Sequence, residues 1–138
     1  MFEHCLYFNT TALARVLERE WSRAFLEVGL TPPQAFMLRL ILDRPGLLQH
    51  EIAEALTISR PTATRALDGL ESKGLVERRA SGRDGREQAI FPRPRALALK
   101  TALNEASAAV TTRLKKRLGP RSFDATVGAL RTVRAALE

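Results

Sequence analysis

Apolar residues recur at helical spacing in two segments of the first third of the chain. The first segment predicts one helical face that ends before Gly29, because its apolar residues follow one another at steps of three, four or seven. They are Leu6, Leu13, Leu17, Trp21, Ala24, Phe25 and Val28. A second helix is predicted after Thr31, an N-cap residue followed by two prolines, and it ends at the Arg-Pro-Gly sequence of 44–46.

Residues 47–79 predict two short helices joined by a tight turn, which is a helix-turn-helix. The first helix covers about 49–56. The second begins with Ser59 as its N-cap, has Pro61 in its first turn and ends at Gly74.

The second helix of such a motif enters the DNA major groove with its N-terminus first. On a helical wheel Ala63, Leu67 and Leu70 share the inner side, and the opposite side is polar and cationic at its N-terminal end. We therefore expect contacts to base edges and phosphates from Ser59, Arg60, Pro61, Thr62, Thr64 and Arg65. The alternative is a solvated helix face with one cap and two ordinary arginines.

Strand-compatible residues follow at 75–79 and 87–91, with Gly82 and Gly85 in the loop between them. This pattern predicts a β-hairpin, or wing, directly after the helix-turn-helix. Its arginines are Arg78, Arg79, Arg83 and Arg86, and Asp84 is placed to pair with one guanidinium and orient it. We expect the wing, through Arg79, Arg83 and Arg86, to contact the DNA backbone or the minor groove. The alternative is an exposed hairpin whose arginines serve solubility.

Composition and charge support a polyanionic partner. The chain has 138 residues, 45% of them hydrophobic, which favours one compact domain. Its formal charge is +7, and residues 78–95 contain six basic side chains against two acidic ones. A second basic cluster, interpreted as a solvated helix end, comprises Arg113, Lys115, Lys116, Arg117 and Arg121.

The residues argue against several other classes of protein. The two histidines lie in separate elements, and no metalloprotease, nucleophile-elbow or phosphate-loop pattern occurs, so we expect no enzyme, no cofactor and no metal site. No apolar run approaches the roughly 18 residues of a membrane span, and the N-terminus does not read as a signal peptide. With Cys5 as the single cysteine, these features predict a cytoplasmic protein.

The order of elements, the sequence SRPTATRALDGLESKGLVERR at 59–79 and the wing signature Asp84-x-Arg86 resemble the MarR family of winged-helix bacterial repressors. The resemblance implies a mainly α fold with a small β wing: a winged helix-turn-helix region at 31–95 and long dimerisation helices at 1–30 and 96–138. It also implies a two-fold dimer with one wing per subunit directed into the minor groove. The chain departs from the family after the second wing strand, where Pro92, Arg93 and Ala96 replace the usual residues.

The last third of the chain predicts two long amphipathic helices, separated at 119–122. Their apolar residues are Leu99, Leu103, Ala106, Val110, Leu114 and Leu118, followed by Phe123, Val127, Leu130 and Leu137. A small DNA-binding head would cover only part of these stripes, so we expect a homodimer that reads two half-sites about 10 base pairs apart in double-stranded DNA. Packing within a monomer is the alternative.

Three hypotheses about regulation stay open. Cys5, with Tyr7 beside it, resembles the oxidised cysteine of the hydroperoxide-sensing branch of the family. Alternatively, Trp21, Phe25 and Phe36 line an apolar pocket for a small aromatic effector. The third hypothesis is a repressor without an effector of its own. A winged helix that binds non-specific DNA, RNA or protein is the alternative function.

Overall fold

The computed structural model describes residues 1–82 and 85–138. Within these residues the helices are α1 (Leu6–Phe25), the short 3-10 helix η1 (Leu26–Val28), α2 (Pro32–Asp43), α3 (Gln49–Leu56), α4 (Arg60–Ser72), α5 (Pro94–Leu118) and α6 (Pro120–Leu137). The strands are β1 (Leu47–Leu48), β2 (Val76–Ser81) and β3 (Glu87–Pro92). The predicted mainly α fold with a small β wing is confirmed.

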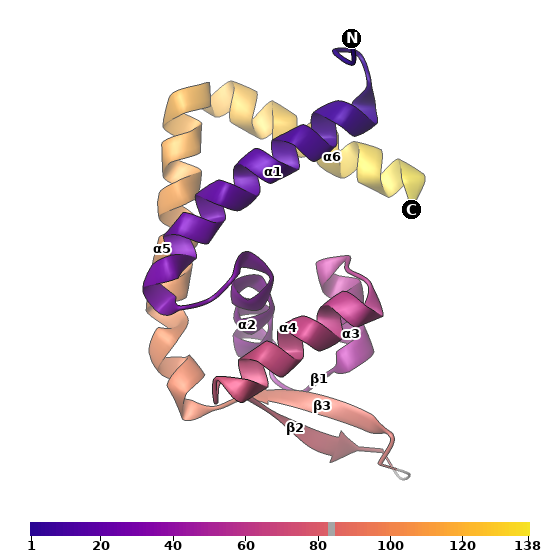
Figure 1. Ribbon diagram of the computed structural model, residues 1–138, viewed down its shortest axis with the longest axis vertical. Coiled ribbons are helices and arrows are strands. Elements are labelled where there is room, and N and C mark those ends of the chain that lie inside the picture. The colour runs from indigo at the N-terminus through magenta and orange to yellow at the C-terminus, as the bar shows by residue number, and fades with distance from the viewer. Residues whose placement is uncertain (83–84) are drawn as a thin grey trace.

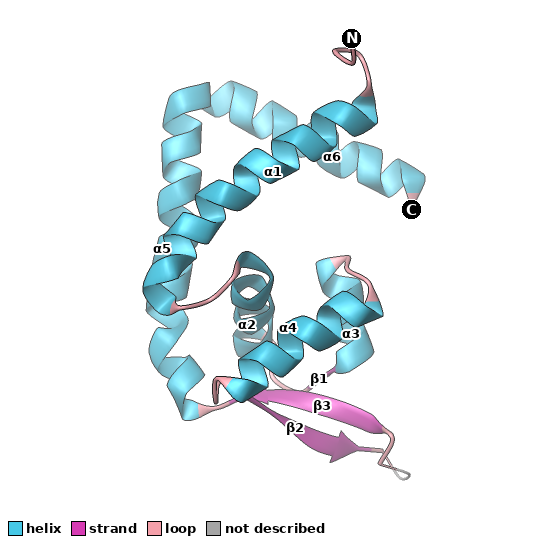
Figure 2. Ribbon diagram, in the orientation of Figure 1, coloured by secondary structure: helices cyan, strands magenta, loops and turns pink. Residues whose placement is uncertain are grey.

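The elements form two regions joined by α5, which runs along one edge of the molecule (Figure 1). At one end α1 packs across α5, α6 leads away from the end of α5, and both chain termini lie there. At the other end α2, α3 and α4 pack together above the small sheet (Figure 2). None of the described helices is long and apolar enough to cross a membrane.

The ends of the first two helices follow from local chemistry. The last turn of the first predicted helix tightens into η1, and Gly29 then adopts the left-handed conformation with φ of 69°, its N–H donating to the carbonyl of Leu26. Thr31 and Gln34 form a capping box, in which each side chain accepts a hydrogen bond from the other residue's backbone N–H. The predicted N-cap at Thr31 is therefore confirmed.

The core lies between α2, α3, α4, the sheet and the facing side of α5. Its largest fully buried side chains are Phe25, Met37, Leu38, Ile41, Ile52, Leu67, Leu70, Val76, Ile90, Leu103 and Val110. The inner residues predicted for α4, namely Ala63, Leu67 and Leu70, are all buried. Because this stripe is fixed on the core, the opposite side of α4 faces outward.

The sheet has one more strand than the sequence predicted. β3 lies in the centre, antiparallel to both β1 and β2. Ile90 of β3 pairs with Leu47 of β1 on one side and with Arg78 of β2 on the other. β1 has only two residues, so it has no alternating pattern to recognise. Gly46 precedes β1 with φ of 90°, a conformation that favours glycine, and it lies close to the Phe91 ring. Its N–H donates to the Ile90 carbonyl, which helps to hold β1 against β3.

The unusual junction after β3 is anchored to the head. Arg93 is the extended N-cap residue of α5, and its backbone N–H donates to the Leu75 carbonyl at 2.9 Å. Ala96 is fully buried, and Arg95 donates to the Lys73 carbonyl. The departure from the family pattern therefore still leaves the base of the wing tied to the end of α4.

Candidate nucleic-acid interface

The N-terminal part of α4 presents the predicted polar face. Ser59 caps the helix through its side-chain oxygen, which accepts from the Thr62 N–H. Arg60, Pro61 and Arg65 are exposed, whereas Thr62 and Thr64 are half-buried along the edges. The positive end of the helix dipole and the two arginines give this end a positive potential.

Two small networks of hydrogen bonds fix the threonines of this face. The Thr62 hydroxyl accepts from the Ser59 hydroxyl at 2.9 Å and from the Arg65 guanidinium at 3.4 Å. This contact engages one of the five N–H donors of Arg65 and holds its side chain along the helix. Arg65 is thereby oriented before any ligand is bound, which lowers the entropy lost on contact.

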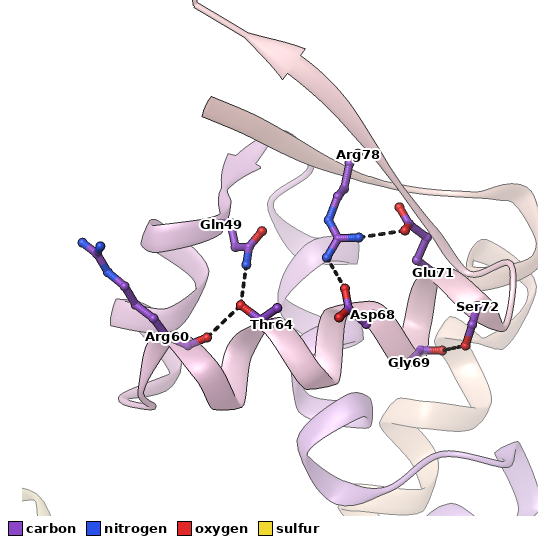
Figure 3. Close-up of polar contacts among 8 residues, drawn as sticks. All are labelled: Gln49, Arg60, Thr64, Asp68, Gly69, Glu71, Ser72 and Arg78. Carbon is purple, nitrogen blue, oxygen red and sulfur yellow. Dashed lines mark hydrogen bonds and ion pairs between the residues drawn. The ribbon is translucent and has the colours of Figure 1, made fainter. Parts of the chain in front are cut away.

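Sequence reasoning missed Gln49, the first residue of α3. Its side-chain amide donates to the Thr64 hydroxyl at 3.0 Å, and that hydroxyl donates to the Arg60 carbonyl at 3.0 Å (Figure 3). The hydroxyl of Thr64 is therefore already engaged within the protein. The signal in the sequence is weak, because a glutamine at a helix start is common and its partner lies 15 residues away.

A cleft of about 320 Å³ lies between α3, α4 and the wing. We call it the recognition cleft. It is lined by Leu48, Gln49, His50, Ala53, Arg60, Ala63, Thr64, Arg86, Glu87 and Gln88. Arg60 from α4 and Arg86 from the wing border the same space, so the two predicted DNA-contacting elements meet there.

The structure divides the wing arginines into different roles. Arg78 turns back onto α4, where its two terminal nitrogens pair with Asp68 at 2.6 Å and Glu71 at 2.7 Å (Figure 3). Only 17% of its side chain is exposed. Arg78, which was not among the predicted wing contacts, therefore joins β2 to α4.

Arg79 and Arg86 lie differently from Arg78. The Arg79 guanidinium stacks 4.0 Å from the centre of the Phe91 ring and pairs with Glu77, yet the side chain is still 57% exposed. Arg86 borders the recognition cleft. The predicted contacts at Arg83 and Asp84 lie outside the described residues.

The candidate sensor cysteine lies at the start of α1. Cys5 is exposed and is the N-cap residue of the helix, its sulfur accepting from the Phe8 N–H at 3.5 Å. Tyr7 is also exposed, and among the described residues no hydrogen bond joins it to Cys5. The thiol is thus accessible to small oxidants.

An open apolar groove of about 600 Å³ separates α1 from the helix-turn-helix. We call it the interhelical groove. It is lined by Ala14, Leu17, Glu18, Trp21, Pro32, Pro33, Phe36, Leu56, Ile58 and Thr62. Trp21 and Phe36 therefore line one groove, whereas Phe25 is fully buried in the core with its ring edge-on to Phe36.

Residues 28–87 match the sequence pattern of the MarR family. The HTH-type transcriptional repressor Rv2887 of Mycobacterium tuberculosis is 35% identical over 103 residues, which cover 72% of this chain and 74% of that protein. This chain belongs to the MarR family. The predicted absence of an enzyme function agrees with this family of transcriptional regulators.

Two other transcriptional regulators extend the comparison. The HTH-type transcriptional regulator YybA of Bacillus subtilis is 30% identical over 80 residues, and the match covers 58% of this chain but only about half, 53%, of YybA. The repressor CouR bound to a 23-mer DNA duplex superposes with a TM-score of 0.87 at 28% identity, covering 96% of this chain and 94% of CouR. CouR bound to p-coumaroyl-CoA gives a TM-score of 0.84 at 25% identity, with the same coverage.

Proposed function

We propose that this MarR-family protein is a dimeric repressor that binds a pseudo-palindromic operator in double-stranded DNA. The observation that carries the proposal is the outward face of α4, whose cationic N-terminal end borders the recognition cleft together with the wing. An α-helix fits the major groove of B-DNA, and side chains near its N-terminus then reach base edges. The structure of CouR on a DNA duplex supports this use of the same fold.

Each contact residue has a role set by its surroundings. Arg65 is held by Thr62 on the exposed side of α4, where its guanidinium reaches base edges. Arg60 flanks the recognition cleft and contacts phosphate. On the other side of the cleft Arg86 directs positive charge toward the neighbouring minor groove, and Arg83 stays a predicted contact outside the described residues.

The second half of the proposal is the dimer. Residues 1–30 and 96–138 form the dimerisation region, and 31–95 form the DNA-binding region. α6 has no buried residue, although it carries a stripe of apolar side chains at Val127, Leu130, Val133 and Leu137. Apolar stripes of this kind are the faces that partner helices cover. A two-fold dimer places two copies of α4 one helical turn of DNA apart.

Selection of bound fragments from sheared genomic DNA, followed by footprinting at near-physiological salt, tests the proposal. We expect a protected pseudo-palindrome whose half-sites lie about 10 base pairs apart. Uniform protection of all fragments, with an affinity that falls steeply as salt rises, would show that the protein binds DNA only through its charge and would contradict the proposal. Retention of RNA or protein instead of duplex DNA would favour the interaction-module alternative.

We propose further that a small aromatic molecule in the interhelical groove regulates the repressor. Thr62 borders this groove and also holds Ser59 and Arg65 on the DNA-facing side of α4. A ligand that displaces Thr62 therefore changes the orientation of Arg65. CouR was solved with p-coumaroyl-CoA, an aromatic thioester, which supports a ligand of this chemical class.

Trp21 makes this regulation measurable, because it is the single tryptophan of the chain and lines the groove. Titration with p-coumaroyl-CoA should change its fluorescence saturably and lower operator affinity over the same concentration range. Coenzyme A without the aromatic acyl group is the matched control. Release of operator with unchanged Trp21 fluorescence would place the effector elsewhere.

Oxidation of Cys5 is the competing signal. Cys5 is exposed at the start of α1, so its thiol is accessible to an oxidant. If it is the sensor, Cys5→Ser should bind the operator as the wild type does and lose peroxide-driven release in an electrophoretic mobility assay. Release by peroxide that persists in Cys5→Ser would exclude the thiol.

A further inference from the structure

The turn between α3 and α4 contains a residue in a rare backbone conformation. Among the described non-glycine residues only Thr57 has a positive φ, at 56°. A β-branched residue is strongly disfavoured in this left-handed region, so surrounding contacts must hold it there. Its N–H donates to the carbonyls of Ala53 and Glu54, and the N–H of Ile58 donates to Ala53 at 3.0 Å.

Thr57 sets the geometry of the helix that follows. Two residues later Ser59 caps α4, so the backbone at Thr57 fixes the direction in which α4 leaves the turn. Ile58, between them, packs against the core. A change in φ at Thr57 therefore reorients the N-terminal end of α4, where Arg60 and Arg65 lie.

The C-terminal helix reaches this turn. The guanidinium of Arg134 donates to the Thr57 hydroxyl at 2.9 Å, although the two residues are 77 positions apart. The same terminal nitrogen lies 3.5 Å from the carboxylate of Glu138, one turn further along α6. Glu138 also lines a hollow with Thr57 and Ser59 of the turn and with Glu54 of α3. Figure 1 shows the end of α6 on the same side of the molecule as α3.

We infer that Arg134 is a positioning residue for DNA binding. Its hydrogen bond holds the strained turn at Thr57, and through it the N-terminus of α4, in a fixed place relative to α6. The inference rests on the proposed function, because α6 belongs to the proposed dimerisation region. The bond thus ties the orientation of each DNA-binding head to the helices that set the distance between the two heads.

Four single variants and one double variant test the inference by operator affinity. Arg134→Ala removes the donor, and Thr57→Val removes the acceptor while keeping the branched shape. Each should weaken operator binding about five-fold, and the double variant should weaken it no further, because both changes break one bond. Thr57→Ser keeps the hydroxyl and should bind like the wild type. Arg131→Ala removes an equal charge three residues earlier on α6 and should also leave affinity unchanged.

The salt dependence of binding separates positioning from direct contact. In Arg134→Ala the slope of log affinity against log salt concentration should equal that of the wild type, since no phosphate contact is lost. A slope smaller by about one would make Arg134 a phosphate contact and overturn the inference. Additive losses in the double variant, unchanged affinity in Arg134→Ala, or an equal loss in Arg131→Ala would overturn it as well.

A readout without DNA keeps this test independent of the proposed function. Hydrogen exchange at the amides of Thr57 and Ile58 should speed up several-fold in Arg134→Ala and stay unchanged in Arg131→Ala. Unchanged exchange in Arg134→Ala would show that the bond does not hold the turn. A wild-type protein that binds no preferred DNA sequence would refute the proposed function, whatever the exchange experiment shows.

Discussion

Neighbouring arginines in this protein differ in role because of the groups beside them. Arg78 and Arg79 are adjacent in β2, yet their side chains leave opposite faces of the strand. One reaches two carboxylates of α4, and the other covers the Phe91 ring. A cluster of arginines on a hairpin therefore does not by itself identify DNA contacts, since part of it neutralises acidic groups of the protein.

Arg78→Ala should destabilise the protein and weaken DNA binding together. The change removes two ion pairs from a mostly buried guanidinium, which is expected to cost about 1 kcal/mol of unfolding free energy. It also leaves Asp68 and Glu71 unneutralised on the helix that approaches DNA phosphates. Urea unfolding and operator titration measure the two effects. Arg78→Lys keeps the charge without the two-pronged geometry, so its stability and operator affinity should lie between those of the wild type and Arg78→Ala. Wild-type stability in Arg78→Ala would contradict the structural role of Arg78.

Changing Arg65 or Arg86 to alanine should weaken DNA binding in two different ways. Arg65→Ala should cost about 1–3 kcal/mol on the operator and little on unrelated duplexes, because base contacts carry the sequence preference. Arg86→Ala should weaken all duplexes alike and lower the salt slope by about one. Affinities for operator and scrambled duplexes at several salt concentrations distinguish the two. An equal loss on both duplexes in Arg65→Ala would contradict its role in base readout.

The helices follow their sequence signals closely, because the signals act within one turn. Thr31, Ser59 and the prolines after them mark helix starts, and Gly29 follows a helix end. The same local rules also identify positions where the residue has a low helix propensity. Gly128 is such a position, inside α6 and opposite its apolar stripe, with open space where a side chain would extend.

Gly128→Ala should raise the free energy of unfolding by about 0.5–1 kcal/mol, because alanine loses less backbone entropy in a helix. Gly69→Ala, inside α4, is the matched control. A side chain there would meet the amide of Gln34, which accepts hydrogen bonds from the Thr31 N–H and from Lys73. We therefore expect no gain from Gly69→Ala in thermal or urea unfolding. A loss of stability in Gly128→Ala would indicate that this side of α6 is covered.

Many apolar side chains of the molecule stay exposed and are not covered by its core. Exposed apolar side chains occur at both ends of the chain, on α1 at Leu6, Tyr7, Phe8 and Leu13 and on α6 at Val127, Leu130, Val133 and Leu137. α1 and α6 cross at the same end of the molecule (Figure 1). This distribution supports the proposed dimer contact at that end and the proposed DNA contact at the other.

Leu130→Glu should separate the proposed dimer, because the dimer would have to bury the new carboxylate in its apolar contact face. Sedimentation equilibrium should give the chain mass of 15.3 kDa instead of twice that value. The operator footprint should shrink to one half-site with much lower affinity. Thr132→Glu, on the opposite side of α6, is the control and should stay dimeric. A dimer that survives Leu130→Glu would move the interface away from this stripe.

The sequence by itself determined where the helices and the wing lie along the chain and which side of α4 faces the core. Caps, prolines, glycines and apolar periodicity act over a few residues, so they can be read without the rest of the molecule. Tertiary structure decided the two-residue strand β1, the pairing of Gln49 with Thr64, and the turn of Arg78 onto α4. It also decided that Arg134 reaches Thr57. Each of these depends on a partner that is distant in the chain, and no local pattern specifies which of many similar side chains will meet.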